Sequence, residues 1–311
     1  MRAGGGPVHV PVGGAEVPVL EVGDPAGRTV VLLPGLTDGL GPVTEPATRR
    51  ALVHRTVPLP RHRGLVLSHR VDATDARRGE APSGPSRRAP SGPSRQAPSG
   101  PLTTERLAAD AAAALEQVLD GPAVLVGHSM GGMVAQHLAA GWPHLVAGLV
   151  LSAAPTHADE GVRGVLERWA ALLDAGDHLG FAHDAASTSM TGRHREEQLA
   201  ELVTEPPSPP RRALVDRHLA LSAAACRHDA RERLPDVRVP TLVLAGEHDR
   251  VVPATHAVAL AAAVPGARLT VLPGVGHAFH EEARAAVRAE VVPFIERFAP
   301  SGRGRGGQEL G

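Results

Sequence analysis

Short apolar runs alternate with segments of helical pattern along most of this chain, and this alternation limits the folds open to it. Several runs are continuously apolar, which is typical of strands buried on both faces of a sheet. These runs cover residues 29–33, 123–126, 145–152, 241–245 and 269–272. A hairpin is expected at 8–12 and 17–22, a weaker strand at 55–59, and helices at 45–52, 130–140, 256–264 and 281–298.

Strands and helices in this order predict an α/β fold, with a mostly parallel sheet covered by helices on both faces. The chain has 311 residues, enough for one large α/β domain with a subdomain and a sizeable core.

Two segments interrupt the alternation. Residues 77–101 contain APSGPSRR, APSGPSRQ and APSGP, a repeat without any large apolar residue, and we expect a disordered insertion there. A proline-rich docking site is the alternative for the repeat. Residues 158–234 have a helical pattern and are expected to form a cap over the carboxyl ends of the strands, where open α/β sheets bind ligands. The core is then expected at 1–157 plus 235–299, and we expect 300–311 to be a frayed, disordered tail.

The composition excludes several classes of protein. Lys and Arg (32) nearly balance Asp and Glu (33), which argues against a nucleic-acid partner. Cys226 is the sole cysteine, so no internal disulfide can form. The first residues lack the apolar block of a secretory signal, and no apolar window is long enough to span a membrane. We therefore expect a cytoplasmic protein without a membrane partner, and the sequence leaves its oligomeric state open.

The stretch LVGHSMGGMVA (125–135) places a serine where a predicted strand should turn into a predicted helix. The pattern G-x-S-x-G in that context is typical of a nucleophile on a sharp turn. Gly127 and Gly131 remove side chains that would collide at such a turn, and the following helix directs its N-terminal amides at Ser129. A glycine-rich structural turn is the alternative.

A serine nucleophile needs a histidine to take its proton. His277 follows the predicted strand at 269–272 on a glycine-rich loop, and we expect it to be that base. His280 is the competitor, although its place at the start of the last helix favours a surface position. His128 is expected to line the pocket or to have a structural role, and the other histidines, which lie mostly in the predicted cap, are expected to be solvated.

A buried carboxylate must hold the histidine in one tautomer. Asp249 lies four residues beyond the end of the predicted strand at 241–245 and suits this role, and Glu247 is the rival. The chain order Ser129, Asp249, His277 is that of a Ser-Asp-His hydrolase.

Taken together, GHSMGG, GEHDRVVP and GVGH resemble the motifs of capped serine hydrolases of the α/β-hydrolase fold superfamily, similar to carboxylesterases. The resemblance covers about 8–298 without the repeat. It implies that the N–H groups of Met130 and Leu36 form the oxyanion hole. Pro34-Gly35 stands where many relatives have His-Gly, and no role is assigned to Arg61, His62 or Ser68.

The resemblance implies a serine hydrolase that cleaves a carboxylic ester, or a related acyl bond, of a small-molecule acyl substrate. It implies no cofactor and no metal, and no HExxH or paired His/Asp spacing is present. An acyltransferase, a thioesterase or a lactonase could use the same residues. A non-hydrolytic ligand sensor of the same fold is the second hypothesis.

Overall fold

A computed structural model describes residues 7–36, 62–69, 71–72 and 101–300. The predicted helix at 45–52, the weaker strand at 55–59, the repeat insertion apart from Pro101, and the tail beyond Pro300 lie outside the described residues.

The described residues form one nine-stranded sheet with the strand order β1-β2-β4-β3-β6-β7-β8-β9, and β5 pairs with β2. The strands are β1 (Val8–Val12), β2 (Ala15–Gly23), β3 (Arg28–Leu33), β4 (His62–Leu67), β5 (Val71–Asp72), β6 (Ala123–His128), β7 (Val146–Ser152), β8 (Thr241–Gly246) and β9 (Arg268–Leu272). β1, β2 and β5 pair antiparallel, whereas β4, β3, β6, β7, β8 and β9 run parallel to one another. The predicted α/β fold with a mostly parallel sheet is confirmed.

The register of the parallel strands brings the ends of the central strands to one edge. Leu33 at the end of β3 pairs with Gly127, and Gly127 pairs in turn with Leu151 of β7. Ser152 at the end of β7 pairs with Leu244 of β8. The loops that leave these strands therefore meet at the carboxyl edge of the sheet, where the predicted functional residues lie.

The central strands are apolar throughout because both faces of the sheet are covered. Neighbouring residues of a strand point to opposite faces. Val31 and Leu125 belong to one core, which they share with α3 (Thr104–Val118), α4 (Met130–Gly141) and α9 (Ala254–Ala263). Val30 and Val124 belong to a second core, which includes Phe279 of α10 (Phe279–Glu282) and residues of α11 (Arg284–Phe298). Short 3-10 helices lie at Pro143–Leu145 and Leu234–Asp236.

The features of the fold that were not predicted include the strand β5 and the following three. β4 lies at His62–Leu67, where the apolar run GLVL pairs parallel with β3. α3 begins after Thr103, whose hydroxyl accepts a hydrogen bond from the Arg106 N–H at 3.2 Å. The last predicted helix is divided at Ala283 into α10 and α11.

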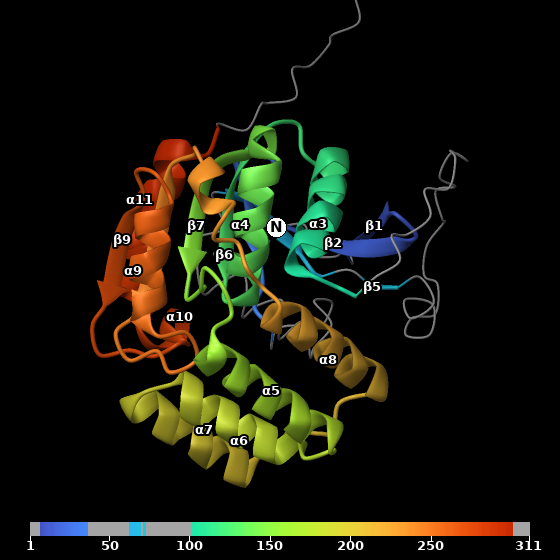
Figure 1. Ribbon diagram of the computed structural model, residues 1–311, viewed down its shortest axis with the longest axis vertical. Coiled ribbons are helices and arrows are strands. Elements are labelled where there is room, and N and C mark those ends of the chain that lie inside the picture. The colour runs from blue at the N-terminus through green and yellow to red at the C-terminus, as the bar shows by residue number, and fades with distance from the viewer. Residues whose placement is uncertain (1–6, 37–61, 70, 73–100, 301–311) are drawn as a thin grey trace, which may run out of the picture.

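Between β7 and β8 the chain forms α5 (Glu160–Asp174), α6 (His178–Ser189), α7 (Gly192–Thr204) and α8 (Arg212–Cys226). Figure 1 shows these helices as a layer of their own, beyond the edge of the sheet toward which the arrows of β7 and β9 point. At the joint between α5 and α6, Gly176 has a positive φ of 79° and Asp177 caps α6. Among the described helices, none combines the length and the apolar character needed to cross a bilayer.

Candidate active site

Ser129 lies at the junction of β6 and α4 in an unusual backbone conformation. Its φ is 51° and its ψ is −119°, a backbone conformation that residues other than glycine rarely adopt. The conformation is held by a bond from the Ser129 N–H to the Ser152 carbonyl at 2.9 Å and by the Gly132 N–H, which donates to the Ser129 carbonyl at 2.9 Å. Strain of this kind persists only where surrounding contacts determine the backbone, and it is concentrated at functional sites.

Two glycines allow the chain to turn this sharply. A Cβ at Gly127 would lie 2.6 Å from the Gly131 carbonyl oxygen, and a Cβ at Gly131 would lie 2.0 Å from the Leu33 carbonyl oxygen. Both distances are far inside van der Waals contact, and the atoms in the way belong to the backbone. The motif glycines therefore permit β6, α4 and the end of β3 to approach one another.

The structure brings Ser129, His277 and Asp249 into one hydrogen-bonded chain, which is called the relay below. His277 Nε2 lies 3.1 Å from Ser129 Oγ, and His277 Nδ1 lies 2.8 Å from Asp249 Oδ2. The Asp249 side chain is fully buried and that of His277 is 9% exposed. An ionised carboxylate can only accept, so the Nδ1–H donates to Asp249, and a neutral His277 leaves Nε2 to accept the Ser129 O–H.

The loop after β8 fixes the carboxylate of Asp249. Its other oxygen, Oδ1, accepts from the N–H groups of Val251 and Val252, each at 2.8 Å. These donors stabilise the negative charge and orient the carboxylate toward His277. The rival Glu247 is exposed, and its carboxylate accepts from the Gly274 N–H at 2.8 Å.

The two residues expected to supply oxyanion-hole amides are Met130, which follows Ser129 in the chain, and Leu36, which follows a glycine that approaches Ser129. Met130 is the first residue of α4, so its N–H is one of the helix N-terminal amides without a partner inside the helix. Leu36 follows Gly35 after the end of β3, and a Cβ at Gly35 would lie 3.4 Å from Ser129 Cβ. The backbone before Leu36 therefore passes next to the serine side chain.

His280 is buried rather than on the surface, so the predicted surface position is wrong. Its exposed fraction is 8% because the short helix α10 packs Phe279 into the second core. His280 Nε2 lies 3.1 Å from His128 Nδ1 and 3.2 Å from Ser152 Oγ. The centroid of the His128 ring lies 5.0 Å from that of the His277 ring, so the pair His128–His280 adjoins His277. Sequence analysis missed Ser152, although its place at the end of a strand next to β6 is a signal that could have indicated it.

Several other histidines are buried, contrary to the expectation that they are solvated. Burial lowers the pKa of His218 to about 4 and, with the nearby His137, that of His228 to about 3. His228 is bonded to Thr104 Oγ1 at 3.0 Å. These rings are neutral near pH 7 and serve as packing groups, and none of them contacts Ser129.

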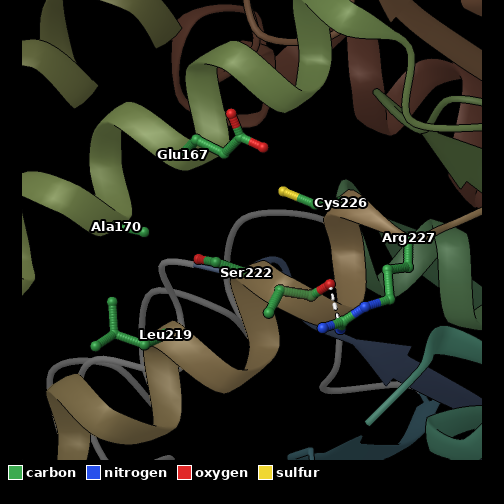
Figure 2. A pocket seen from close by; sticks show the side chains of 7 residues that line it. Glu167, Ala170, Leu219, Ser222, Cys226 and Arg227 are labelled. Atoms are coloured by element: carbon green, nitrogen blue, oxygen red, sulfur yellow. Dashed lines mark hydrogen bonds between the residues drawn. The ribbon is translucent and has the colours of Figure 1, made fainter. Parts of the chain in front are cut away.

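A separate hollow of about 290 Å³ lies between α5 and α8 (Figure 2). Its lining includes Glu167, Ser222 and Cys226, and none of the residues of the hydrogen-bonded relay borders it. Cys226 is half-buried, and burial together with the charge of Glu167 raises the pKa of its thiol. The hollow does not form part of the candidate site. The described residues contain no cluster of His, Cys, Asp and Glu that could hold a metal ion.

The arrangement has the parts that acyl transfer requires. An alcohol is bonded to an imidazole that can accept its proton, and a buried carboxylate can offset the resulting charge. Helix N-terminal amides next to the alcohol can hold a developing oxyanion.

Comparison with known proteins gives both a family and a fold. The sequence profile described as alpha/beta hydrolase fold matches residues 29–283. The chain is 33% identical over 178 residues to a pimeloyl-[acyl-carrier protein] methyl ester esterase of Xanthomonas oryzae pv. oryzae, a match that covers 50% of this chain and 64% of that protein.

Among solved structures, an alpha/beta hydrolase enzyme from a Medee basin deep-sea metagenome library superimposes with a TM-score of 0.68 at 20% identity, covering 91% of this chain and 94% of that one. An enol-lactonase from Burkholderia xenovorans LB400 superimposes with a TM-score of 0.65 at 20% identity, covering 93% and 100%. At these identities the likeness shows the fold alone. The family profile covers most of the chain, and the chain belongs to the α/β hydrolase fold family.

Proposed function

We propose that this protein is a serine hydrolase that cleaves carboxylic esters, with Ser129 as nucleophile, His277 as general base and Asp249 as the carboxylate that orients the base. The observation that carries the proposal is the continuous hydrogen-bonded chain from Ser129 Oγ through His277 to Asp249. An isolated serine hydroxyl is a poor nucleophile near pH 7, and such a chain removes that obstacle.

In the first half of the reaction, His277 Nε2 takes the proton of Ser129 as Oγ attacks the ester carbonyl. The tetrahedral intermediate collapses when His277 returns the proton to the leaving alcohol, and the acyl group stays on Ser129. Water then attacks the acyl-enzyme with His277 again as the base, and the carboxylic acid leaves. Asp249 remains ionised throughout and stabilises the imidazolium.

We assign the oxyanion to the N–H groups of Met130 and Leu36. Each would donate to the carbonyl oxygen as it becomes negative, and the loss of one such donor costs a factor of about 100–1000 in kcat. The assignment is supported by the place of Met130 at the N-terminus of α4 and by the approach of the Gly35 backbone to Ser129.

The substrate class is supported by the relatives. The curated relative from Xanthomonas oryzae pv. oryzae is named as a methyl ester esterase, and this chain spans 64% of its length. We propose further that 158–234, with helices α5–α8, form a cap over the site, and that the core comprises 1–157 plus 235–299. The aromatic residues of the cap, Trp169 and Phe181, are buried in edge-to-face contact with each other. Because neither ring is free to stack on a substrate, the cap favours aliphatic over aromatic acyl groups.

The test is the turnover of short p-nitrophenyl esters by the wild-type protein and by Ser129→Ala. We expect wild-type turnover and its loss in Ser129→Ala. Ser222→Ala, which removes a buried hydroxyl outside the relay, is the matched control and should keep the wild-type rate. An active wild type whose rate survives Ser129→Ala would contradict the assignment. Fluorophosphonate labelling of Ser129 without turnover of any ester would favour the ligand-sensor alternative.

A further inference from the structure

The carboxylate of Glu282 joins the loop that carries His277 to the α6–α7 junction, defined here as residues 187–191, from the last turn of α6 to the residue before α7. Its Oε1 accepts from the Gly276 N–H at 3.1 Å, and its Oε2 accepts from the Thr191 N–H at 2.9 Å. The Thr191 hydroxyl also contacts Glu282 Oε2 and lies 3.0 Å from the Gly274 carbonyl, so its single proton has two acceptors within reach. Both oxygens of one half-buried carboxylate are thus used between the two segments.

The same junction is bonded to the candidate site at two more points. The Ala278 N–H donates to the Ser189 carbonyl at 2.9 Å, and the Arg250 guanidinium donates to the Ser187 carbonyl. Arg250 directly follows Asp249. The junction is therefore bonded to both of the loops that supply the partners of Ser129.

The contact between junction and loop is close as well as polar. A Cβ at Gly276 would lie 2.6 Å from the Ser189 carbonyl oxygen, so this approach requires glycine. Gly276 and Ala278 are the chain neighbours of His277 on either side. Each is held to the junction, the first through Glu282 and the second through Ser189.

We propose that Glu282 is a positioning residue, which keeps the His277 imidazole in line with Ser129 by binding the histidine loop to the α6–α7 junction. The inference rests on the proposed function. Hydrogen bonds to an ionised acceptor are about twice as strong as neutral ones, so this carboxylate gives the loop a stiff attachment. Because Glu282 reaches the backbone beside His277 and no group of the relay itself, its loss should affect kcat rather than KM.

The first experiment measures kcat and KM on a short p-nitrophenyl ester, together with the rate of fluorophosphonate labelling of Ser129. In Glu282→Ala we expect kcat and the labelling rate to fall by about 10–100-fold, because a displacement of about 1 Å costs this much, while KM stays within about threefold. Glu282→Gln should be intermediate, because its amide nitrogen replaces one acceptor oxygen. Glu290→Gln makes the same charge change on α11, where Glu290 pairs with Arg268, and should match the wild type.

Thr191 provides a second set of variants that leave Glu282 in place. Thr191→Val keeps the shape and the backbone N–H but loses the hydroxyl, and kcat should fall by about 3–10-fold, a smaller loss than in Glu282→Ala because only one hydrogen bond is removed. Thr191→Ser restores the hydroxyl and should recover the wild-type rate. Equal losses in the Val and Ser variants would overturn the role of the hydroxyl in the attachment.

The second experiment needs no activity. Amide hydrogen exchange of the peptides that cover 187–191 and 274–278 should accelerate at least about tenfold in Glu282→Ala, with α5 and α8 unchanged. Unchanged exchange would overturn the attachment, and faster exchange with unchanged kcat and labelling would overturn the positioning role. Wild-type labelling without turnover of any ester would refute the proposed function alone, since the labelling rates of the variants still test the positioning of His277.

Discussion

The backbone of Ser129 offers a direct test of strain at the candidate nucleophile. With φ at 51° and ψ at −119°, the Cβ of any residue other than glycine is strained at this position. Ser129→Ala and Ser129→Gly both remove the hydroxyl, but only Ser129→Gly also removes the Cβ. Comparing the two variants therefore isolates the strain from the loss of the hydrogen bond to His277.

The expected difference follows from two opposing terms. A residue held in a sparsely populated conformation costs about 1–3 kcal/mol, which Ser129→Gly recovers. The greater freedom of glycine in the unfolded chain costs about 0.5–1 kcal/mol. The free energy of unfolding of Ser129→Gly should therefore exceed that of Ser129→Ala by up to about 2.5 kcal/mol, while both variants lose esterase activity.

Denaturant unfolding at matched protein concentration measures this difference. Ala140→Gly, near the end of the same helix α4, is the control, because there the replacement only adds freedom to the unfolded chain and weakens the helix by about 1 kcal/mol. The effect of replacing alanine by glycine should thus have opposite signs at 129 and 140. If Ser129→Gly is less stable than Ser129→Ala by the ordinary glycine penalty, a Cβ does not strain the backbone at residue 129.

Three further predictions concern the turn, the carboxylate and a buried histidine. Gly131→Ala should destabilise the fold by about 1–3 kcal/mol and lower kcat by about 100-fold, because its Cβ would lie 2.0 Å from a backbone oxygen. Gly141→Ala is the control: no atom lies within 4 Å of the added Cβ, so this variant should be neutral or stabilising in thermal unfolding. Asp249→Asn should lower kcat by about 10⁴-fold with little change in KM, because an amide can hold the wrong tautomer of the histidine. The pKa of His218 is lowered to about 4 by burial, so the unfolded chain binds the extra proton first, and stability that is present above pH 6.5 is lost as the pH falls toward 4. His218→Leu should reduce the loss of unfolding free energy between pH 7 and pH 5 by about 2 kcal/mol, and the exposed His183→Gln should not.

Each of these predictions has a contrary result. Equal stabilities of Gly131→Ala and Gly141→Ala would mean that the turn has room for a Cβ. A kcat for Asp249→Asn within about tenfold of the wild type would remove the carboxylate from the proposed mechanism. Parallel pH–stability curves for the wild type and His218→Leu would show that this ring takes up its proton equally well in the folded and the unfolded protein.

The parts of the fold that the sequence predicts are those determined by local pattern. Continuous apolar runs such as residues 29–33 indicate buried strands because both of their faces must meet helices. β4 was missed because its short run GLVL is flanked by the polar residues RHR and SHR. α3 could have been predicted, because Thr103 is a typical N-cap residue and Leu107, Ala111 and Leu115 recur at the four-residue spacing of a helix.

The candidate site likewise contains residues that local sequence indicates and contacts that depend on tertiary packing. Ser129, His277 and Asp249 each lie in a motif or directly after a predicted strand, so the sequence indicates them. The burial of His280 and the contacts of Glu282 depend on how α10 and the α6–α7 junction pack, and no local pattern encodes such partners.

If Ser129 is the nucleophile, it carries the acyl group during turnover, and this intermediate can be trapped. Wild-type protein mixed with p-nitrophenyl acetate, quenched in acid within the first turnover and digested, should yield a peptide containing Ser129 that is heavier by one acetyl group. His277→Ala should yield the same peptide without the label over that time. Rapid release of p-nitrophenol by the wild type with an unmodified Ser129 peptide, or an acetyl group on another residue, would show that Ser129 is not the nucleophile.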